Sequence, residues 1–166
     1  MFHDFDRMPM QSRVWIYQAN RPLTAKEENM IMYSLKNSLN TWNAHGEPLL
    51  GSVRIDEGRF VLVAVDESHN GPSGCSIDAS THWLKDLGTE LNVDFFDRSL
   101  AYIKDNEILT VPVFGLKKAV ENGLLLADTV IFNNNSVQTK SQLVSSWKMA
   151  ASKSPFLSKY FNKQVA

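Results

Sequence analysis

Cysteine is nearly absent from this chain, since Cys75 is the only one among 166 residues. A single cysteine can form neither an intramolecular disulfide nor a cysteine-rich zinc site, so the sequence excludes a fold stapled by either. Long apolar runs are also missing, because none approaches the roughly 18 residues that a membrane span needs. Residues 1–6 (MFHDFD) lack a basic region followed by an apolar one. We therefore expect no signal peptide, no membrane association and a cytoplasmic location.

An excess of charge of either sign is absent as well. The chain carries 17 basic and 18 acidic residues, for a formal net charge of -1. A net charge so close to zero gives no overall electrostatic attraction for DNA, RNA or an anionic membrane, so we expect no nucleic-acid partner. The hydrophobic fraction of 43% is ordinary for a globular protein. A chain of this size buries roughly 70% of its unfolded surface, which is enough for one core without metal. We expect a single domain over 1–166, with no cofactor.

Hydrophobic periodicity predicts alternating strands and helices in the first two thirds of the chain. Thr24 and Glu27 form a capping box, so a helix should follow Thr24. Residues 56–58 (DEG) are a tight-turn signal between two apolar runs, which predicts a hairpin. The expected order is strand 14–17, the capped helix, strands 49–55 and 59–65, helix 77–91, and strand 100–103.

This order is that of the ferredoxin-like split βαβ fold. It predicts an α+β protein with a mostly antiparallel sheet and both helices on one face. The βαββαβ core would span 13–104, a surface arm would precede it over 1–12, and a C-terminal extension would cover 105–166.

The extension is predicted to add a strand and further helices. Strand 108–113 would lie at a sheet edge, where Pro112 is tolerated. A bare edge there makes homodimerisation through the sheet a hypothesis. Beyond it the sequence indicates a short helix over 116–122, a strand over 130–132, a helix opened by Thr139 that carries Leu143 and Trp147, and a terminal helix from Ser154 through Phe161.

The segment 71–80 (GPSGCSIDAS) is the most informative, because an apolar strand leads into it and a helix leads out. Its first five residues equal the opening of a Walker A sequence in transporter ATPases. The lysine that should follow is missing and Asp78 lies near its place, so we reject an ATPase. Backbone amides at the helix start could still hold an anion, unless Ser73 or Ser76 simply caps the helix. The candidate ligand-binding residues are Ser73, Gly74, Cys75, Ser76 and Asp78.

The same segment can be interpreted as a thiol site. A cysteine at a helix N-terminus has a favoured thiolate. Asp78 and His82 share its helix face, opposite the apolar stripe, and should point to solvent or a cleft. His82 is about 10 Å of helical rise from Cys75, which is too far for a direct pair. His69 or His45 would have to act as the base. Cys75 as a packing residue is the alternative, and a metal site in this region has no recognised ligand spacing.

Four segments carry a resemblance that covers the whole chain. They are residues 12–21 (SRVWIYQANR), 74–80 (GCSIDAS), 96–98 (FDR) and 132–134 (FNN). As a set they resemble a family of uncharacterised bacterial proteins of similar length, whose members are often labelled "ABC transporter ATPase". The resemblance implies no catalytic residues.

Two functions follow as hypotheses from the sequence. The first is a non-catalytic domain that binds a small anionic ligand or a protein partner through loop 68–78, with Arg13, Arg98 and Trp42 as neighbours. The second is a cysteine-dependent enzyme with Cys75 as nucleophile and His69 or His45 as base.

Overall fold

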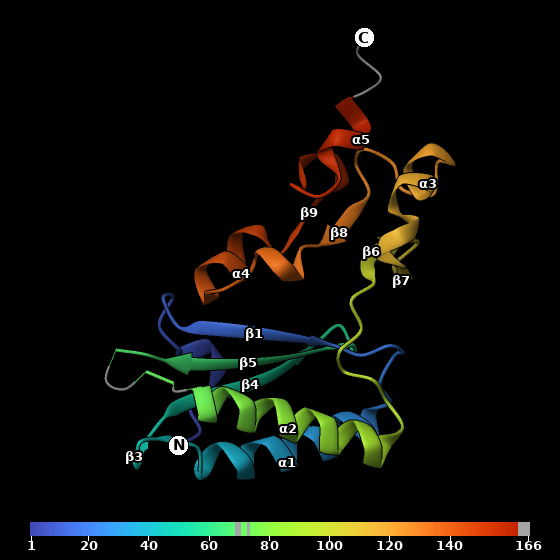
Figure 1. Ribbon diagram of the computed structural model, residues 1–166. Coiled ribbons are helices and arrows are strands. Elements are labelled where there is room, and N and C mark those ends of the chain that lie inside the picture. The colour runs from blue at the N-terminus through green and yellow to red at the C-terminus, as the bar shows by residue number, and fades with distance from the viewer. Residues whose placement is uncertain (69–70, 73, 163–166) are drawn as a thin grey trace. The chain divides into compact units, whose positions relative to one another are not determined.

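The chain folds into two compact units, each with its own antiparallel sheet (Figure 1). The structure is a computed structural model that describes residues 1–68, 71–72 and 74–162, apart from the side chain of Cys75. The first unit contains Met1–Asp97 together with Gln138–Ser141. The second contains Arg98–Val137 and the residues from Gln142 onward. Helices and mostly antiparallel strands occur in both units, which confirms the predicted α+β class.

The first unit is a three-stranded sheet with two long helices on one face (Figure 1). The strand order is β1-β5-β4, and both pairings are antiparallel. A short β2–β3 hairpin follows the first helix. The elements of this unit are β1 (Arg13–Gln18), α1 (Ala25–Asn40), β2 (Asn43–Ala44), β3 (Glu47–Pro48), β4 (Leu50–Asp56), β5 (Phe60–Asp66) and α2 (Gly74–Leu91).

The central strand β5 is buried along its whole length. Val61, Val63 and Val65 belong to one core with residues of both helices, among them Leu35 and Leu84. The alternate residues of the strand point to the opposite face of the sheet and are equally inaccessible to water. A strand that is buried on both faces has a near-continuous apolar sequence, which is why residues 59–65 could be identified as a strand.

The predicted capping box at the start of α1 is present. Thr24 Oγ1 accepts from the Glu27 amide at 3.1 Å, and Glu27 Oε1 accepts from the Thr24 amide at 2.9 Å. Arg21 adds a bidentate pair, with its two terminal nitrogens 2.9 and 2.7 Å from the Glu27 carboxylate oxygens. Arg21 also donates to the Leu91 carbonyl at the end of α2. Glu27 therefore joins the start of one helix to the end of the other through Arg21.

The three sheet strands follow the split βαβ order, but the predicted fourth strand does not join them. In the ferredoxin-like fold, residues 100–103 would pair with the free edge of β1. That edge is instead contacted by two other segments: Val14 donates to the Gln138 carbonyl at 3.0 Å, and Gln18 forms a single bridge with Phe96. Residues 100–104 form a strand of the second unit. A turn of two residues joins them to the next strand, so the local pairing costs little chain entropy.

The N-terminal segment is not the predicted surface arm. Phe5 and Met8 are buried, and the His3 amide donates to the Gly51 carbonyl at 2.7 Å beside β4. The ammonium group of Lys140 donates to three backbone carbonyls of this segment, at 2.8 to 3.0 Å. Two buried apolar side chains and one lysine far along the chain therefore hold the segment in the first unit. Its short 3-10 helix, η1 (Phe5–Arg7), ends under that ammonium group.

The second unit is a four-stranded sheet of order β7-β6-β8-β9, whose core includes Tyr102, Leu125, Ile131 and Leu157. The strand predicted over 108–113 is an edge strand, as expected, but it ends before Pro112. The helix after Thr139 ends just before Trp147, and the terminal helix is shorter than predicted. The elements are β6 (Leu100–Lys104), β7 (Glu107–Val111), η2 (Val113–Gly115), α3 (Leu116–Glu121), β8 (Val130–Phe132), η3 (Asn134–Ser136), β9 (Lys148–Ala150), η4 (Ala151–Lys153) and α5 (Ser158–Asn162). The helix α4 (Lys140–Ser146) begins in the first unit with Lys140 and Ser141, and its remaining residues belong to the second.

Stability should depend on acid pH through Glu27. Hydrogen bonding from Arg21, and then from the Thr24 amide, lowers the pKa of Glu27 from 4.5 to about 2. A depressed folded-state pKa contributes stability above the unfolded pKa, and the contribution disappears as pH falls through the folded one. The melting-temperature difference between wild type and Glu27→Gln should therefore shrink from pH 5 to pH 2. Glu28→Gln, in the same turn, is the control, and a constant Glu27→Gln difference over this range would contradict the assignment.

Lys140 should be a strong determinant of stability. Lys140→Met keeps the apolar stem but removes all three donations to the N-terminal segment. Because buried carbonyls would lose a charged donor, we expect the free energy of unfolding to fall by about 2–4 kcal/mol in urea titrations. Lys85→Met at an exposed lysine of α2 should change it by less than about 0.5 kcal/mol. Equal effects of the two substitutions would refute this role.

Candidate functional site

The helix α2 begins earlier than the sequence suggested, at Gly74 rather than at residue 77. Before it, the chain leaves β5 through a tight turn in which Asp66 Oδ1 accepts from the Ser68 amide at 2.9 Å and from its hydroxyl at 2.7 Å. Ser76 lies inside the first turn of the helix and is buried. Ser76 is therefore not the N-cap residue.

Trp42 connects the end of α1 to the first turn of α2. Its indole N–H donates to the Ser76 carbonyl at 2.8 Å, and its side chain is only 3% exposed. The ring contacts Trp83 edge to face, with 5.5 Å between the ring centroids and 69° between the planes. A buried tryptophan whose polar atom is satisfied is held in one orientation. The two indoles therefore form a fixed aromatic wall beside α2.

The β2–β3 hairpin places His45 near the same helix end. Ala44 pairs with Glu47, so His45 and Gly46 form a two-residue loop. Their φ angles are 54° and 82°, as a type I′ turn requires at both central positions. Glycine adopts such an angle freely, and histidine is among the residues that tolerate it. The turn leaves the His45 side chain exposed.

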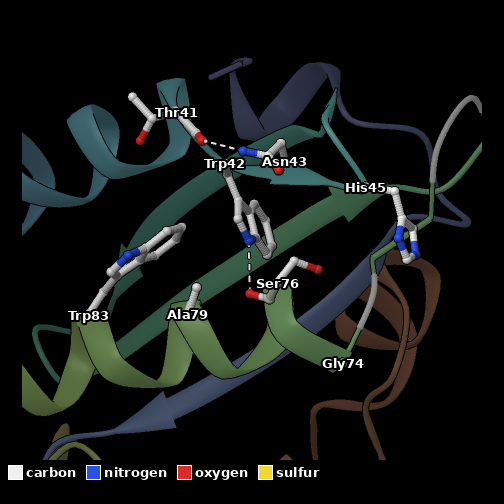
Figure 2. Close-up of a pocket in the computed structure, with 8 residues that line it drawn as sticks. All are labelled: Thr41, Trp42, Asn43, His45, Gly74, Ser76, Ala79 and Trp83. Carbon is white, nitrogen blue, oxygen red and sulfur yellow. Dashed lines mark hydrogen bonds between the residues drawn. The ribbon is translucent and has the colours of Figure 1, made fainter.

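These elements enclose a groove with a cavity volume of about 790 Å³. Figure 2 shows Trp83 at one end of the row of side chains and His45 at the other, with Trp42 and Ser76 between them. Asn43 is tied to the hairpin entry because its side-chain amide donates to the Thr41 carbonyl at 3.3 Å. The groove is lined by Thr41, Trp42, Asn43, His45, Gly74, Ser76, Ala79 and Trp83.

The structure brings together part of the predicted site. Gly74, Ser76 and His45 line one groove, together with the predicted neighbour Trp42. Asp78 does not line it, and its exposed side chain lies on the helix face that the sequence assigned to solvent, as does that of His82. Ser73, His69 and the side chain of Cys75 lie outside the described residues. Cys75 itself is the second residue of α2.

The two arginines proposed as neighbours are not part of this groove. Arg13 lies at the start of β1, 3.7 Å from a Glu67 carboxylate oxygen and over the ring of Trp15. Arg98 belongs to the second unit. Within the described residues, no group of three or more histidine, cysteine or acidic side chains is arranged to hold a metal ion. No helix in the described part of the chain is long and apolar enough to span a membrane.

Sequence reasoning missed the hairpin and the far wall of the groove. A two-residue His-Gly turn is an uncommon variant of the Asn-Gly signal, and strands of two residues carry no periodicity. Trp83 could have been assigned to the same side of the helix as Ser76 from the sequence, because positions 76, 79 and 83 share a helix face at spacings of three and four. Their alignment with Trp42 depends on the packing of α1 against α2, which no local pattern specifies.

Comparison of the chain with protein-family models, with curated proteins and with solved structures finds no match. The resemblance to the bacterial family therefore stays a prediction.

Proposed function

We propose that this protein is a non-catalytic binding protein of the cytoplasm, whose groove beside α2 holds a small organic anion with a flat apolar part. The groove volume of about 790 Å³ lies within the range typical of small-molecule sites. The observation that carries the proposal is the composition of its lining: indole rings toward one end, and hydrogen-bond donors without any carboxylate toward the other, among the described residues.

The aromatic end supports a flat ligand. Trp42 and Trp83 lie edge to face, so the two indole rings present differently oriented aromatic surfaces to a ligand in the groove. The Trp42 nitrogen is already committed to Ser76, so Trp42 offers ring surface rather than a hydrogen bond. Rigid aromatic surface costs little side-chain entropy when a ligand binds.

The other end supports a negative charge. Gly74 starts a helix of 18 residues, and the dipole of such a helix favours an anion at this end. His45 adds an imidazole that can donate a hydrogen bond from the hairpin. Two acidic residues are near this end in the sequence, Glu47 two residues after His45 and Asp78 four residues after Gly74, and both are exposed and outside the lining. Among the described lining residues, an anionic group would therefore meet hydrogen-bond donors and no carboxylate.

A cysteine-dependent enzyme is the second candidate. It is favoured by one observation, which is that His45 lines the same groove as Gly74 and Ser76, the two neighbours of Cys75 in the sequence. Under this alternative Cys75 would be the nucleophile and His45 the base.

Blocking the groove tests the binding proposal. Ala79 lines the groove, so Ala79→Tyr should fill it, whereas Asp86→Tyr adds the same ring at an exposed site of α2 outside it. Indole-3-acetate and adenosine monophosphate serve as probes with a flat part and an anion. A probe at about 100 times its dissociation constant should stabilise wild type and Asp86→Tyr by about 2.7 kcal/mol, seen as a raised melting temperature. Ala79→Tyr should show no shift.

Two results of this experiment would count against the proposal. One is the absence of any shift with either probe at millimolar concentration. The other is an equal shift in Ala79→Tyr and wild type, which would place binding elsewhere. Inorganic phosphate and indole, each supplied separately, should give smaller shifts than indole-3-acetate, because each engages only one end of the groove.

Iodoacetamide labelling separates binding from catalysis. If Cys75 is not a nucleophile, its labelling rate should rise with pH around a midpoint near 8.5, the value of an unperturbed thiol. A midpoint well below this value, moved upward by His45→Asn, would favour the enzyme instead. Asparagine suits the positive φ angle of position 45, so His45→Asn removes the imidazole while keeping the turn.

A further inference from the structure

The outer edge of β7, in the second unit, carries backbone groups that pair with no described strand. Among the described strands only β6 pairs with β7, which therefore lies at the end of its sheet. The turn between them has two residues, Asp105 and Asn106, with φ angles of 52° and 63°. In such a hairpin the two residues that flank the turn, Lys104 and Glu107, exchange two backbone hydrogen bonds. Along the hairpin, hydrogen-bonded pairs then alternate with non-hydrogen-bonded pairs.

This alternation assigns the backbone groups of β7 to its two sides. Glu107, Leu109 and Val111 direct their N–H and C=O groups toward β6. Ile108 and Thr110 direct theirs outward. The next outward position is Pro112, which has no N–H. The edge thus presents two donors and two acceptors within three residues, and it ends at a proline.

Apolar side chains accompany this edge. Leu109 is 38% exposed, Val113 is 60% exposed and Phe114 is 94% exposed. Scattered exposed apolar residues are ordinary, but these three lie within six residues: Leu109 is on the edge strand itself, and Val113 and Phe114 follow it in η2. Natural edge strands usually carry charges or bulges at such positions.

We propose that β7 pairs with β7 of a second copy of this chain, antiparallel, about a two-fold axis through Leu109. In this register Ile108 of one copy lies opposite Thr110 of the other. The two-fold axis generates a second, identical pair, in which Thr110 of the first copy lies opposite Ile108 of the second. Four hydrogen bonds form, and every outward N–H and C=O of Ile108 and Thr110 finds a partner. The two Leu109 side chains meet at the axis in a non-hydrogen-bonded pair, where Cα atoms approach to about 4.5 Å.

Neighbouring registers are worse for a physical reason. A two-fold axis at Thr110 would place Ile108 opposite Pro112, which leaves the Ile108 carbonyl without a donor in both copies. An axis at Ile108 would place Thr110 opposite Asn106, which is in the left-handed conformation of the turn and cannot continue a strand. The proline and the turn therefore leave the Leu109 register as the one that satisfies the edge.

Charge complementarity supports a second copy as the occupant. The Leu109 register brings residue 105 of one copy opposite residue 113 of the other. Asp105 and Glu107 outnumber Lys104 in the turn, whereas α3, which follows position 113, carries Lys117 and Lys118 against Glu121, whose carboxylate lies 3.9 Å from the Lys117 ammonium group. Each copy thus combines a turn of net negative charge with a helix of net positive charge, as an isologous interface requires of its two halves.

The test measures the mass of the full chain by light scattering at concentrations from about 1 µM to about 500 µM, since a small interface gives a weak dimer. Wild type should rise from 18.8 kDa toward twice that mass. Leu109→Arg and Leu109→Glu should each stay monomeric, because like charges would face each other at the axis. An equimolar mixture of the two should regain the doubled mass.

Backbone variants probe the hydrogen bonds separately. Thr110→Pro removes an outward N–H without touching the β6 pairing, and it should weaken dimerisation at least tenfold, whereas Thr110→Val keeps the N–H and should dimerise as wild type does. Circular dichroism checks that each variant is folded. A wild type that stays at 18.8 kDa throughout overturns the proposal. So does a mixture of the charged variants that stays monomeric, or a folded Thr110→Pro that dimerises as wild type does.

Discussion

Complete burial of β5 is the constraint on which the first unit depends. A strand with water on neither face needs a covering layer on each side, and its neighbours in the sheet must satisfy its backbone. On one side α1 and α2 supply the cover, joined through Arg21, Glu27 and the Leu91 carbonyl. The position of α2 over that face also fixes where its first turn lies.

The groove is a by-product of that packing. Trp42 follows α1 directly, and its hydrogen bond to the Ser76 carbonyl sets the separation between the end of one helix and the start of the other. The hairpin then has to turn back toward β4 within a few residues, which requires the left-handed angles of His45 and Gly46. An aromatic wall and a histidine thus come to line one hollow beside the helix start.

The sequence was informative wherever the signal is local. The Thr24 capping box, the apolar run of β5 and the solvent-facing position of Asp78 all depend on residues within one or two turns of each other, and the structure has them as predicted. Part of the groove lining could be predicted for the same reason, because Gly74 and Ser76 belong to a local strand–loop–helix pattern.

What the sequence could not predict depends on competition between distant segments. Residues 100–104 have the composition of a fourth strand for the first sheet, yet their two-residue turn commits them to β7. Phe5 and Met8 lie in a polar stretch of sequence, which predicts a surface arm. Their fixed position depends on Lys140, which donates to their backbone carbonyls from far along the chain. Likewise Trp83 becomes a groove residue only through its contact with Trp42. Hydrophobic periodicity within a segment predicts none of these contacts, because each joins residues that are far apart in the sequence or depends on how two helices pack.

The segment Gln138–Ser141 has a consequence for how the protein is made. It belongs to the first unit, although forty residues of the second unit, Arg98–Val137, separate it from Asp97. The ribosome therefore has to synthesise most of the second unit before the Val14 amide can find the Gln138 carbonyl and before Lys140 can reach Phe5. During that interval β1 and the N-terminal segment lack these partners, so the nascent first unit is exposed to misassembly until residue 141 emerges.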